Sequence, residues 1–242
     1  MRQHAFHHLY QQRKANSTKP FNARGSKVSR CSYCQVATDF CLCGDQPNIN
    51  TNVAVMLIVS DNEVMKPSNT GRLIADVVKE TYVYQWNRTD PDADMLNWLN
   101  HPDYYPVVVF PDSYTDDKTR LITEVRGKEC EHRKPLLIFI DGSWREARRI
   151  FRRSPWLSEL PVLSIAPQAL SQYMMRHSDN EQHLSTAEVA SIVLDQVQEV
   201  QAAQTLQLWF EVFRESYLLS KTRLKPDLTR PCLQTYRDAV LP

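Results

Sequence analysis

Four cysteines lie within thirteen residues near the start of the 242-residue chain. Cys31, Cys34, Cys41 and Cys43 have the spacing C-x2-C-x6-C-x-C. Four thiolates can surround one tetrahedral Zn²⁺, and the two short pairs are suited to chelating turns. A four-thiolate iron–sulfur cluster and four unmetallated thiols are the alternatives. We expect a zinc ion with a structural role, because protein ligands would fill all four positions around it.

A second stretch contains residues that could take part in a reaction. It reads PLLIFIDGSWREARRIFRR and covers residues 135–153. Its apolar first part is typical of a buried strand, and this strand ends in Asp141. A carboxylate there is costly without a partner, so we expect Asp141 to bond the backbone of the next loop or to meet a ligand. Trp144 follows on the first turn of a helix, where it can pack in the core or stack on a purine.

The helix after Trp144 carries more guanidinium groups than solubility requires. The planar fork of arginine is suited to phosphate. We therefore expect the helix to contact RNA or another phosphate-bearing ligand, and a solvated face is the alternative. The five residues are Arg145, Arg148, Arg149, Arg152 and Arg153.

Two S-x-x-E strings predict capped helix starts. Ser143 with Glu146 forms one capping box, and Ser185 with Glu188 forms the other. Helix N-termini present free N–H groups and the positive end of a dipole, so two of them at one sheet edge could hold a carboxylate or a phosphate. The alternative is that each box only caps its helix.

The charge is unevenly distributed. Residues 1–30 contain seven Lys or Arg and no Asp or Glu, whereas the rest of the chain is net negative. We expect residues 1–30 to be a flexible basic arm that contacts a polyanion, and a merely solvated tail is the alternative. Residues 31–46 would then form a cysteine module, and residues 47–242 the main domain.

The chain shows no signal-peptide pattern, and its apolar runs are far shorter than the ~20 residues of a membrane helix. We expect a cytoplasmic protein without a membrane segment, in which thiols stay reduced.

Apolar runs alternate with amphipathic segments along the main domain. This alternation predicts an α/β fold with a parallel sheet and helices on both faces, and ligands at the carboxyl ends of the strands. Neither a G-x-G-x-x-G string nor a P-loop is present. The predicted strands cover residues 53–60, 81–86, 106–110, 135–140 and 160–166, and the predicted helices cover 70–80, 92–100, a segment from Ser143 onward and two segments within 185–224.

Several motifs follow the cysteines in a distinctive order. They are KPSNTGRLI at 66–74, FPD at 110–112, DGSW at 141–144 and LSTAE at 184–188. Over roughly residues 30–220 this order resembles DTW-domain proteins, a family of tRNA-uridine aminocarboxypropyltransferases. The motif that names the family usually reads Asp-x-Thr-Trp, and Ser143 replaces Thr here while keeping the hydroxyl. The motif also resembles that of the related rRNA aminocarboxypropyltransferases.

The resemblance implies a SPOUT-like fold with a C-terminal knot, S-adenosylmethionine as donor and tRNA as partner, with no obligate protein partner inferred. The 3-amino-3-carboxypropyl group would pass to N3 of a uridine, at position 47 of the variable loop by family inference, and 5′-methylthioadenosine would leave. Asp141 is the candidate general base. The candidate cofactor-binding residues are Asn69, Thr70, Gly71, Pro111, Ser143, Trp144, Ser185, Thr186 and Glu188.

Two other functions fit the same residues. A SPOUT-type RNA methyltransferase would share the fold and the donor but would release S-adenosylhomocysteine. A non-catalytic zinc-containing RNA-binding protein would bind tRNA without consuming the donor.

Overall fold

The structure of the protein is a computed structural model, which describes residues 1–18, 27–125, 130, 132–165, 184–220 and 227–240. Within these residues the strands form a single six-stranded sheet in the order β2-β1-β5-β3-β6-β4, and every neighbouring pair is parallel. The strands are β1 (Ala54–Val59), β2 (Thr81–Gln85), β3 (Tyr104–Val109), β4 (Leu121–Ile122), β5 (Lys134–Asp141) and β6 (Val162–Leu163).

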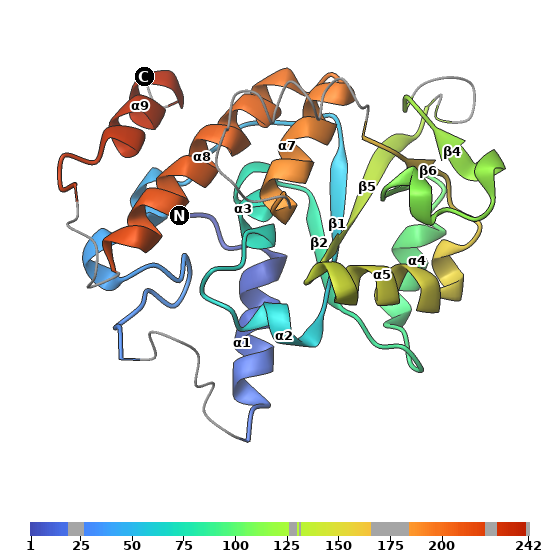
Figure 1. The fold of residues 1–242 in the computed structure, drawn as a ribbon, viewed down its shortest axis with the longest axis horizontal. Coiled ribbons are helices and arrows are strands. Elements are labelled where there is room, and N and C mark those ends of the chain that lie inside the picture. Colours follow the sequence, from blue (N-terminus) through green and yellow to red (C-terminus); the bar gives the residue numbers. More distant parts are fainter. Residues whose placement is uncertain (19–26, 126–129, 131, 166–183, 221–226, 241–242) are drawn as a thin grey trace.

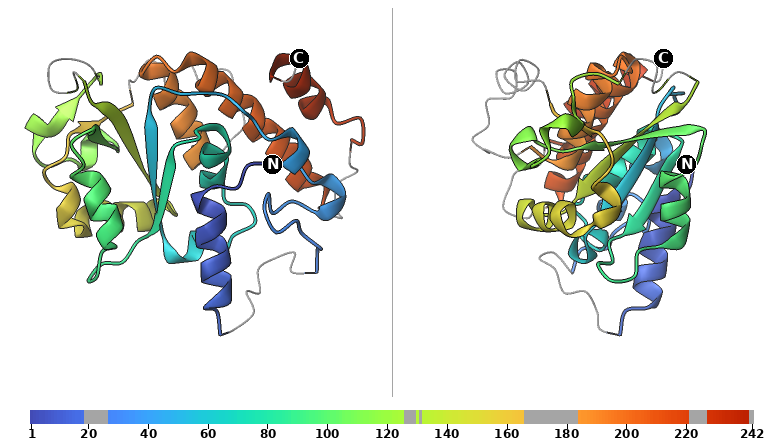
Figure 2. Two further views of the ribbon diagram at one scale, coloured as in Figure 1. Left: turned by 180° about the vertical axis from the view of Figure 1, so that it is seen from behind. Right: turned by 90° about the vertical axis from the view of Figure 1, so that its right-hand side faces the viewer.

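Helices cover both faces of this sheet (Figures 1 and 2). One face packs against α1 (Ala5–Ala15), α3 (Gly71–Val77), α7 (Thr186–Gln196) and α8 (Val200–Leu219). The opposite face packs against α4 (Ala93–Leu99) and α5 (Trp144–Arg153). A short helix, α2 (Asp61–Val64), follows β1, and α9 (Pro231–Val240) packs beside α8 near the end of the chain.

Burial on two faces explains the continuous apolar runs. All six residues of β1 are buried; Leu57 faces the cluster under α3, α7 and α8, whereas Met56 faces the cluster under α4 and α5. The last residue of β1, Val59, pairs with Asp141, so these two neighbouring strands end level with each other. The segments after them therefore meet at one edge of the sheet, where the backbone N–H of Ser60 donates to the carbonyl of Asp141 over 2.8 Å.

The structure confirms the predicted α/β class, the parallel sheet and its helical covers. It also confirms two helices within 185–224 and a strand in each predicted region, although β6 has only the two residues Val162–Leu163. The two-residue strand β4 and helix α9 were not predicted. The C-terminal part that was expected to form a knot includes residues 166–183 and 221–226, which lie outside the described part of the chain.

The first fifteen residues differ from the expected flexible arm. Helix α1 packs against β2 and α3, and Phe6 is only 1% exposed. Arg2 donates from Nη2 to the backbone carbonyls of Ala75 and Asp76, at 2.9 and 2.7 Å. Buried apolar area and these hydrogen bonds offset the cost of ordering this segment. Residues 19–26, also assigned to the arm, lie outside the described residues.

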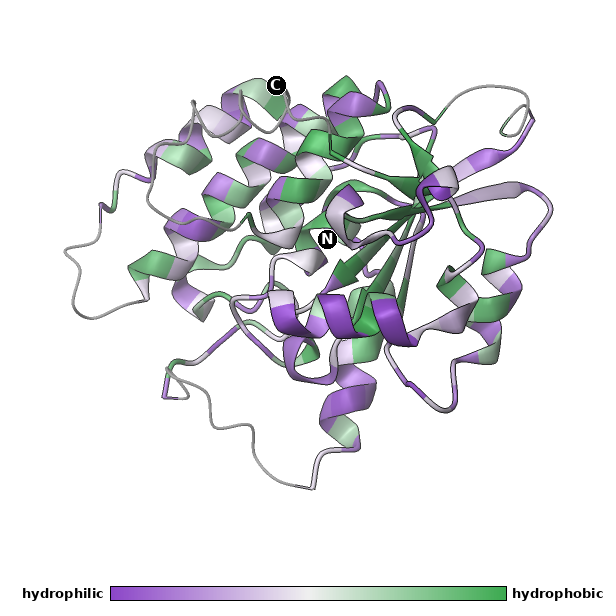
Figure 3. Ribbon diagram, turned by 45° about the vertical axis from the view of Figure 1, so that its right-hand side comes forward, coloured by the Kyte–Doolittle hydropathy of each residue, from purple (hydrophilic) through white to green (hydrophobic). Residues whose placement is uncertain are grey.

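Hydropathy follows this layered arrangement. The strands are mainly hydrophobic, whereas α5 is mainly hydrophilic (Figure 3). None of the described helices combines the length and the apolar character needed to cross a bilayer.

Candidate active site

Asp141 lies at the carboxyl edge of the sheet and is 3% exposed. Its Oδ2 accepts a hydrogen bond from Nδ2 of Asn69 over 2.6 Å, and its Oδ1 accepts one from Oγ1 of Thr186 over 2.7 Å. The carboxylate is thus bonded by two side chains rather than by the backbone of the next loop. A carboxylate can accept about four hydrogen bonds, so each oxygen retains accepting capacity.

Three segments far apart in the sequence meet at this carboxylate. Asn69 comes from the KPSNTGRLI loop, Asp141 from β5 and Thr186 from the first turn of α7. Gly71 allows the close approach, because a Cβ atom at that position would lie 2.6 Å from Oδ2 of Asp141. The structure therefore brings together residues that the sequence predicted only separately, including the candidate base and three candidate cofactor-binding residues.

The surroundings of Asp141 favour its protonated form more than water does. Burial raises the pKa of Asp141 above its ordinary value, and the hydrogen bonds from Asn69 and Thr186 offset part of that rise. The charge of Glu63 also raises the pKa, and that of Arg72 lowers it. A raised pKa makes the ionised carboxylate a stronger base, which is one way in which active sites prepare proton acceptors.

An apolar cavity of about 120 Å³ adjoins the carboxylate. Thr186 belongs to its wall and thereby connects it to Asp141. Trp144 forms another part of the wall; its ring lies 5.8 Å from that of Phe110, and it is 40% exposed, so it is not a core residue. Of the candidate cofactor-binding residues, Pro111, Trp144 and Thr186 line this cavity.

The two predicted capping boxes are both present. Ser143 accepts from the backbone N–H of Glu146 at the start of α5, and Ser185 accepts from that of Glu188 at the start of α7. The hydroxyl of Ser143 and the carboxylate of Glu188 thus serve their own helices. Thr70 precedes α3 without a capping hydrogen bond from its side chain. Both capped helices nevertheless begin beside Asp141: α5 starts three residues after it, and Thr186 of α7 bonds its carboxylate.

The arginines of α5 lie along a surface that starts at the cavity. None of them forms an ion pair with a described residue. Arg148 lies over the rings of Tyr114 and Trp144, 5.7 and 5.8 Å from their centres, and Arg149 lies 5.4 Å from the centre of Trp86. Guanidinium groups interleaved with aromatic rings are typical of single-stranded nucleic-acid surfaces.

The four cysteines converge on one point. Sγ of Cys31 lies 3.6 Å from that of Cys43, and Sγ of Cys34 lies 3.8 Å from that of Cys41. All four sulfurs lie within 4.8 Å of one another. Tetrahedral zinc with bonds of about 2.3 Å places its sulfurs about 3.8 Å apart, so the donor set fits this ion. The segment also packs into the main core, where Val36 is fully buried.

A second group of ligand-type residues consists of His4, His7 and Asp76, whose donor atoms also lie within 4.8 Å of one another. We interpret it as an internal hydrogen-bond network. The carboxylate of Asp76 already accepts from Gln46 over 2.7 Å and from Trp209 over 3.0 Å, and it pairs with His4 over 3.1 Å. The positive charges of Arg2 and Arg72 already interact with Asp76. A divalent metal ion at this cluster would therefore add positive charge close to two guanidinium groups.

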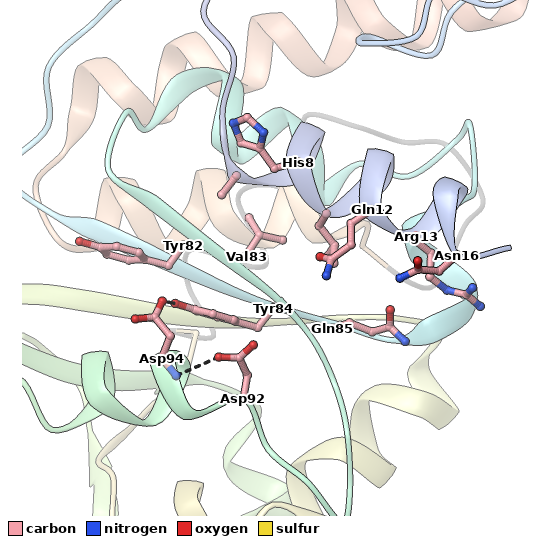
Figure 4. A pocket seen from close by; sticks show the side chains of 12 residues that line it. His8, Gln12, Arg13, Asn16, Tyr82, Val83, Tyr84, Gln85, Asp92 and Asp94 are labelled. Carbon is pink, nitrogen blue, oxygen red and sulfur yellow. Dashed lines mark hydrogen bonds between the residues drawn. The ribbon is translucent and has the colours of Figure 1, made fainter.

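The groove in Figure 4 is larger, about 480 Å³, and lies between α1 and the edge strand β2. Its wall combines residues such as His8, Gln12 and Arg13 with the carboxylates Asp92 and Asp94. None of the predicted site residues lines it, so we place the candidate active site at Asp141.

One residue of the site was missed by sequence reasoning. Arg72 is 3% exposed, within a helix in which every residue is buried. The sequence signal was a charged residue inside the apolar GRLIADV segment, which is unusual because a buried charge needs a partner.

Comparison with known proteins identifies the family of the chain. No solved structure matches the chain. A family model described as the DTW domain matches residues 28–218, a range that includes the cysteine cluster, the loop with Asn69 and the DGSW segment. The chain therefore belongs to the DTW domain family, which indicates a tRNA-modifying enzyme.

Proposed function

We propose that the protein transfers the 3-amino-3-carboxypropyl group of S-adenosylmethionine to N3 of a uridine in tRNA. The observation that carries this proposal is the buried carboxylate of Asp141, bonded by Asn69 and Thr186 beside an apolar cavity, in a DTW domain. Family inference favours position 47 of the variable loop as the acceptor. A SPOUT-like, knotted arrangement of the chain and a cytoplasmic location belong to the same proposal.

The reaction balances without an additional reactant. Uridine N3 forms a bond to the γ-carbon of the methionine moiety, and the bond between that carbon and sulfur breaks. Sulfur keeps the electron pair, so the sulfonium leaves as neutral 5′-methylthioadenosine. The proton of N3 goes to the carboxylate of Asp141. A positioned base with a pKa raised toward the working pH is effective for a weak acid such as N3.

The neighbouring residues divide into two groups by chemistry. The apolar cavity with Pro111 and Trp144 is suited to part of the adenosine moiety. The polar side, with Asn69 and Thr70 and the capped N-termini of α5 and α7, is suited to the aminocarboxypropyl moiety. This division would expose the γ-carbon rather than the methyl group to the incoming base.

The tRNA would bind along α5, whose arginines are free to meet phosphates. The cysteine segment would carry a structural zinc ion that helps to fix this side of the fold.

Isotope labelling tests the choice of group. Donor labelled in the methyl group and donor labelled in the aminobutyrate chain are each incubated with unmodified tRNA and the protein. We expect label to enter tRNA only from the chain-labelled donor. Label from the methyl group would identify a methyltransferase, and no label from either donor would favour a non-catalytic RNA-binding protein.

Asp141→Asn separates two roles for the carboxylate. If Asp141 is the base, the variant should lose about 10²- to 10⁴-fold in single-turnover rate while its donor affinity stays within about tenfold. If Asp141 instead binds the donor's ammonium group, calorimetry should show the loss in affinity first. Normal turnover would exclude both roles.

A further inference from the structure

Arg72 links the N-terminal segment to the loop at the active site. Its Nη2 donates to the carbonyl of Lys66 over 2.8 Å, and its guanidinium lies 5.5 Å from the ring centre of Phe6 in α1. The backbone N–H of Arg72 donates to Oδ1 of Asn69 over 3.1 Å. The other end of this amide, Nδ2, donates to Asp141. Arg72 thus contacts both ends of the loop that carries Asn69.

A buried guanidinium needs a reason, because an apolar side chain could fill the same space without a desolvation cost. Burial lowers the pKa of Arg72 to about 10, and its Nε has no hydrogen-bond partner among the described residues. The group therefore remains charged at neutral pH although the fold only partly satisfies it. Its positive charge interacts most strongly with Asp76 and also with Asp141, and its Nη2 donates to the Lys66 carbonyl.

We propose that Arg72 is a positioning residue, which fixes the loop of residues 66–70, and with it Asn69, against the reacting carboxylate of Asp141. This inference rests on the proposed role of Asp141 as the base. The helix α1, through Phe6, supports the guanidinium from the opposite side. The N-terminal segment would then contribute to the active site through the fold rather than as an RNA-binding arm.

The charged groups around Asp141 define the expected titration. Glu63 of α2 raises the pKa of Asp141, and Arg72 of α3 lowers it. The acidic residues in the first turns of α5 and α7, Glu146 and Glu188, are engaged in capping boxes. Among these groups, Arg72 is the cation that lowers the pKa of Asp141. Removing its charge should therefore move the titration of Asp141 toward higher pH.

The test uses two substitutions and a matched control. Arg72→Met keeps an unbranched chain but removes the charge and the donors, whereas Arg72→Lys keeps the charge without the planar fork. Arg2→Met is the control, because Arg2 bonds the carbonyls at the far end of α3 and does not contact the loop. The titration of Asp141 is followed by NMR of labelled carboxyl carbons, assigned with Asp141→Asn, in the protein without donor or tRNA.

We expect the titration midpoint of Asp141 to move to higher pH in Arg72→Met, to move less in Arg72→Lys, and to stay in place in Arg2→Met. Transfer per folded molecule should fall at least about tenfold in both Arg72 variants, because a displaced loop misplaces the reacting groups. If Arg72→Met does not fold, reduced transfer in folded Arg72→Lys supports the proposal, and normal transfer overturns it.

An unmoved midpoint in folded Arg72→Met, with normal transfer per folded molecule, would leave Arg72 with a purely structural role. Failure of the proposed function would look different. In that case wild-type protein would transfer no group, while the NMR titration would still report whether Arg72 acts on Asp141.

Discussion

The carboxylate of Asp141 is held by neutral donors, since neither Asn69 nor Thr186 carries a charge. Its pKa is raised by burial above the value of about 3.9 expected in an unfolded chain. The folded state therefore prefers the protonated acid. The resulting contribution to stability is present at low pH and is lost as pH rises through the folded pKa. Ionisation of the carboxylate at higher pH therefore costs the fold stability.

Asp141→Asn should consequently melt at a higher temperature than wild type at neutral pH. The asparagine can accept from Asn69 and donate to Thr186, so it keeps both contacts without the buried charge. The difference in Tm should shrink as pH falls through the raised folded pKa of Asp141, where the wild-type carboxyl becomes protonated. Thermal unfolding measured across this range checks the prediction, and a difference independent of pH would contradict it.

Asp76 is a control, because its expected effect on the pH dependence of stability has the opposite sign. Burial alone would raise its pKa, but the hydrogen bonds and charges around it, those of His4 first, lower the pKa overall. Its contribution to stability is present at neutral pH and is lost as pH falls. Asp76→Asn should therefore lower Tm at neutral pH, unlike Asp141→Asn.

Gly71 is constrained by contact. A methyl group there would overlap Oδ2 of Asp141 at 2.6 Å, although alanine generally favours helices. Gly71→Ala should therefore reduce transfer at least about tenfold through displacement of the carboxylate. Gly44→Ala is the matched control, since a Cβ at Gly44 meets no atom within 4 Å. Normal single-turnover rates in Gly71→Ala would show that the site tolerates a displaced carboxylate.

At the scale of elements, the sequence predicted the order of strands and helices because burial on both faces produces long apolar runs. The capping boxes at Ser143 and Ser185 were equally readable, since their signal is local. The contacts between Asn69, Asp141 and Thr186 were not, because they join three segments through parallel pairing. Strand β4 was not predicted because its two residues are too few to show a periodic pattern.

Helix α5 should dominate binding to RNA. Arg149→Ala combined with Arg152→Ala should weaken tRNA binding and reduce the magnitude of the log–log salt slope by roughly two units, one for each lost phosphate contact. Donor binding should not change. Arg214→Ala combined with Arg237→Ala removes the same charge from α8 and α9 and should leave the slope nearly unaltered. Equal salt slopes in the two double variants would show that the α5 arginines form a solvated face and do not contact tRNA phosphates.

At the scale of the whole molecule, the cysteine segment and the N-terminus are integrated into the domain. Gln46 bonds Asp76 of α3, and Tyr236 of α9 donates to the carbonyl of Asp45 over 2.8 Å. The basic composition of residues 1–30 concealed this role, because charge counts do not show that Phe6 is buried or that Arg2 bonds α3. Composition alone therefore predicted a flexible arm that contacts a polyanion, whereas Ala5–Ala15 form a helix packed against β2 and α3.

This integration predicts the effect of losing the metal. We expect one zinc ion per chain, and Cys41→Ser should abolish its binding. Because Val36 and Leu42 of this segment belong to the main core, the variant should also lower the Tm of the whole protein. Cys130→Ser, at a cysteine outside the cluster, should keep the metal. Elemental analysis of protein purified without chelators checks the stoichiometry, and the absence of zinc and iron would contradict the assignment.

The identity of the donor's by-product, together with the mass of the modified nucleoside, tests the central claim most directly. Unmodified tRNA is incubated with the protein and S-adenosylmethionine, the small molecules are separated, and the tRNA is digested to nucleosides for mass spectrometry. We predict 5′-methylthioadenosine in equal amount to a uridine that carries one 3-amino-3-carboxypropyl group. S-adenosylhomocysteine with a methylated nucleoside would contradict the account, as would tRNA binding with the donor left intact.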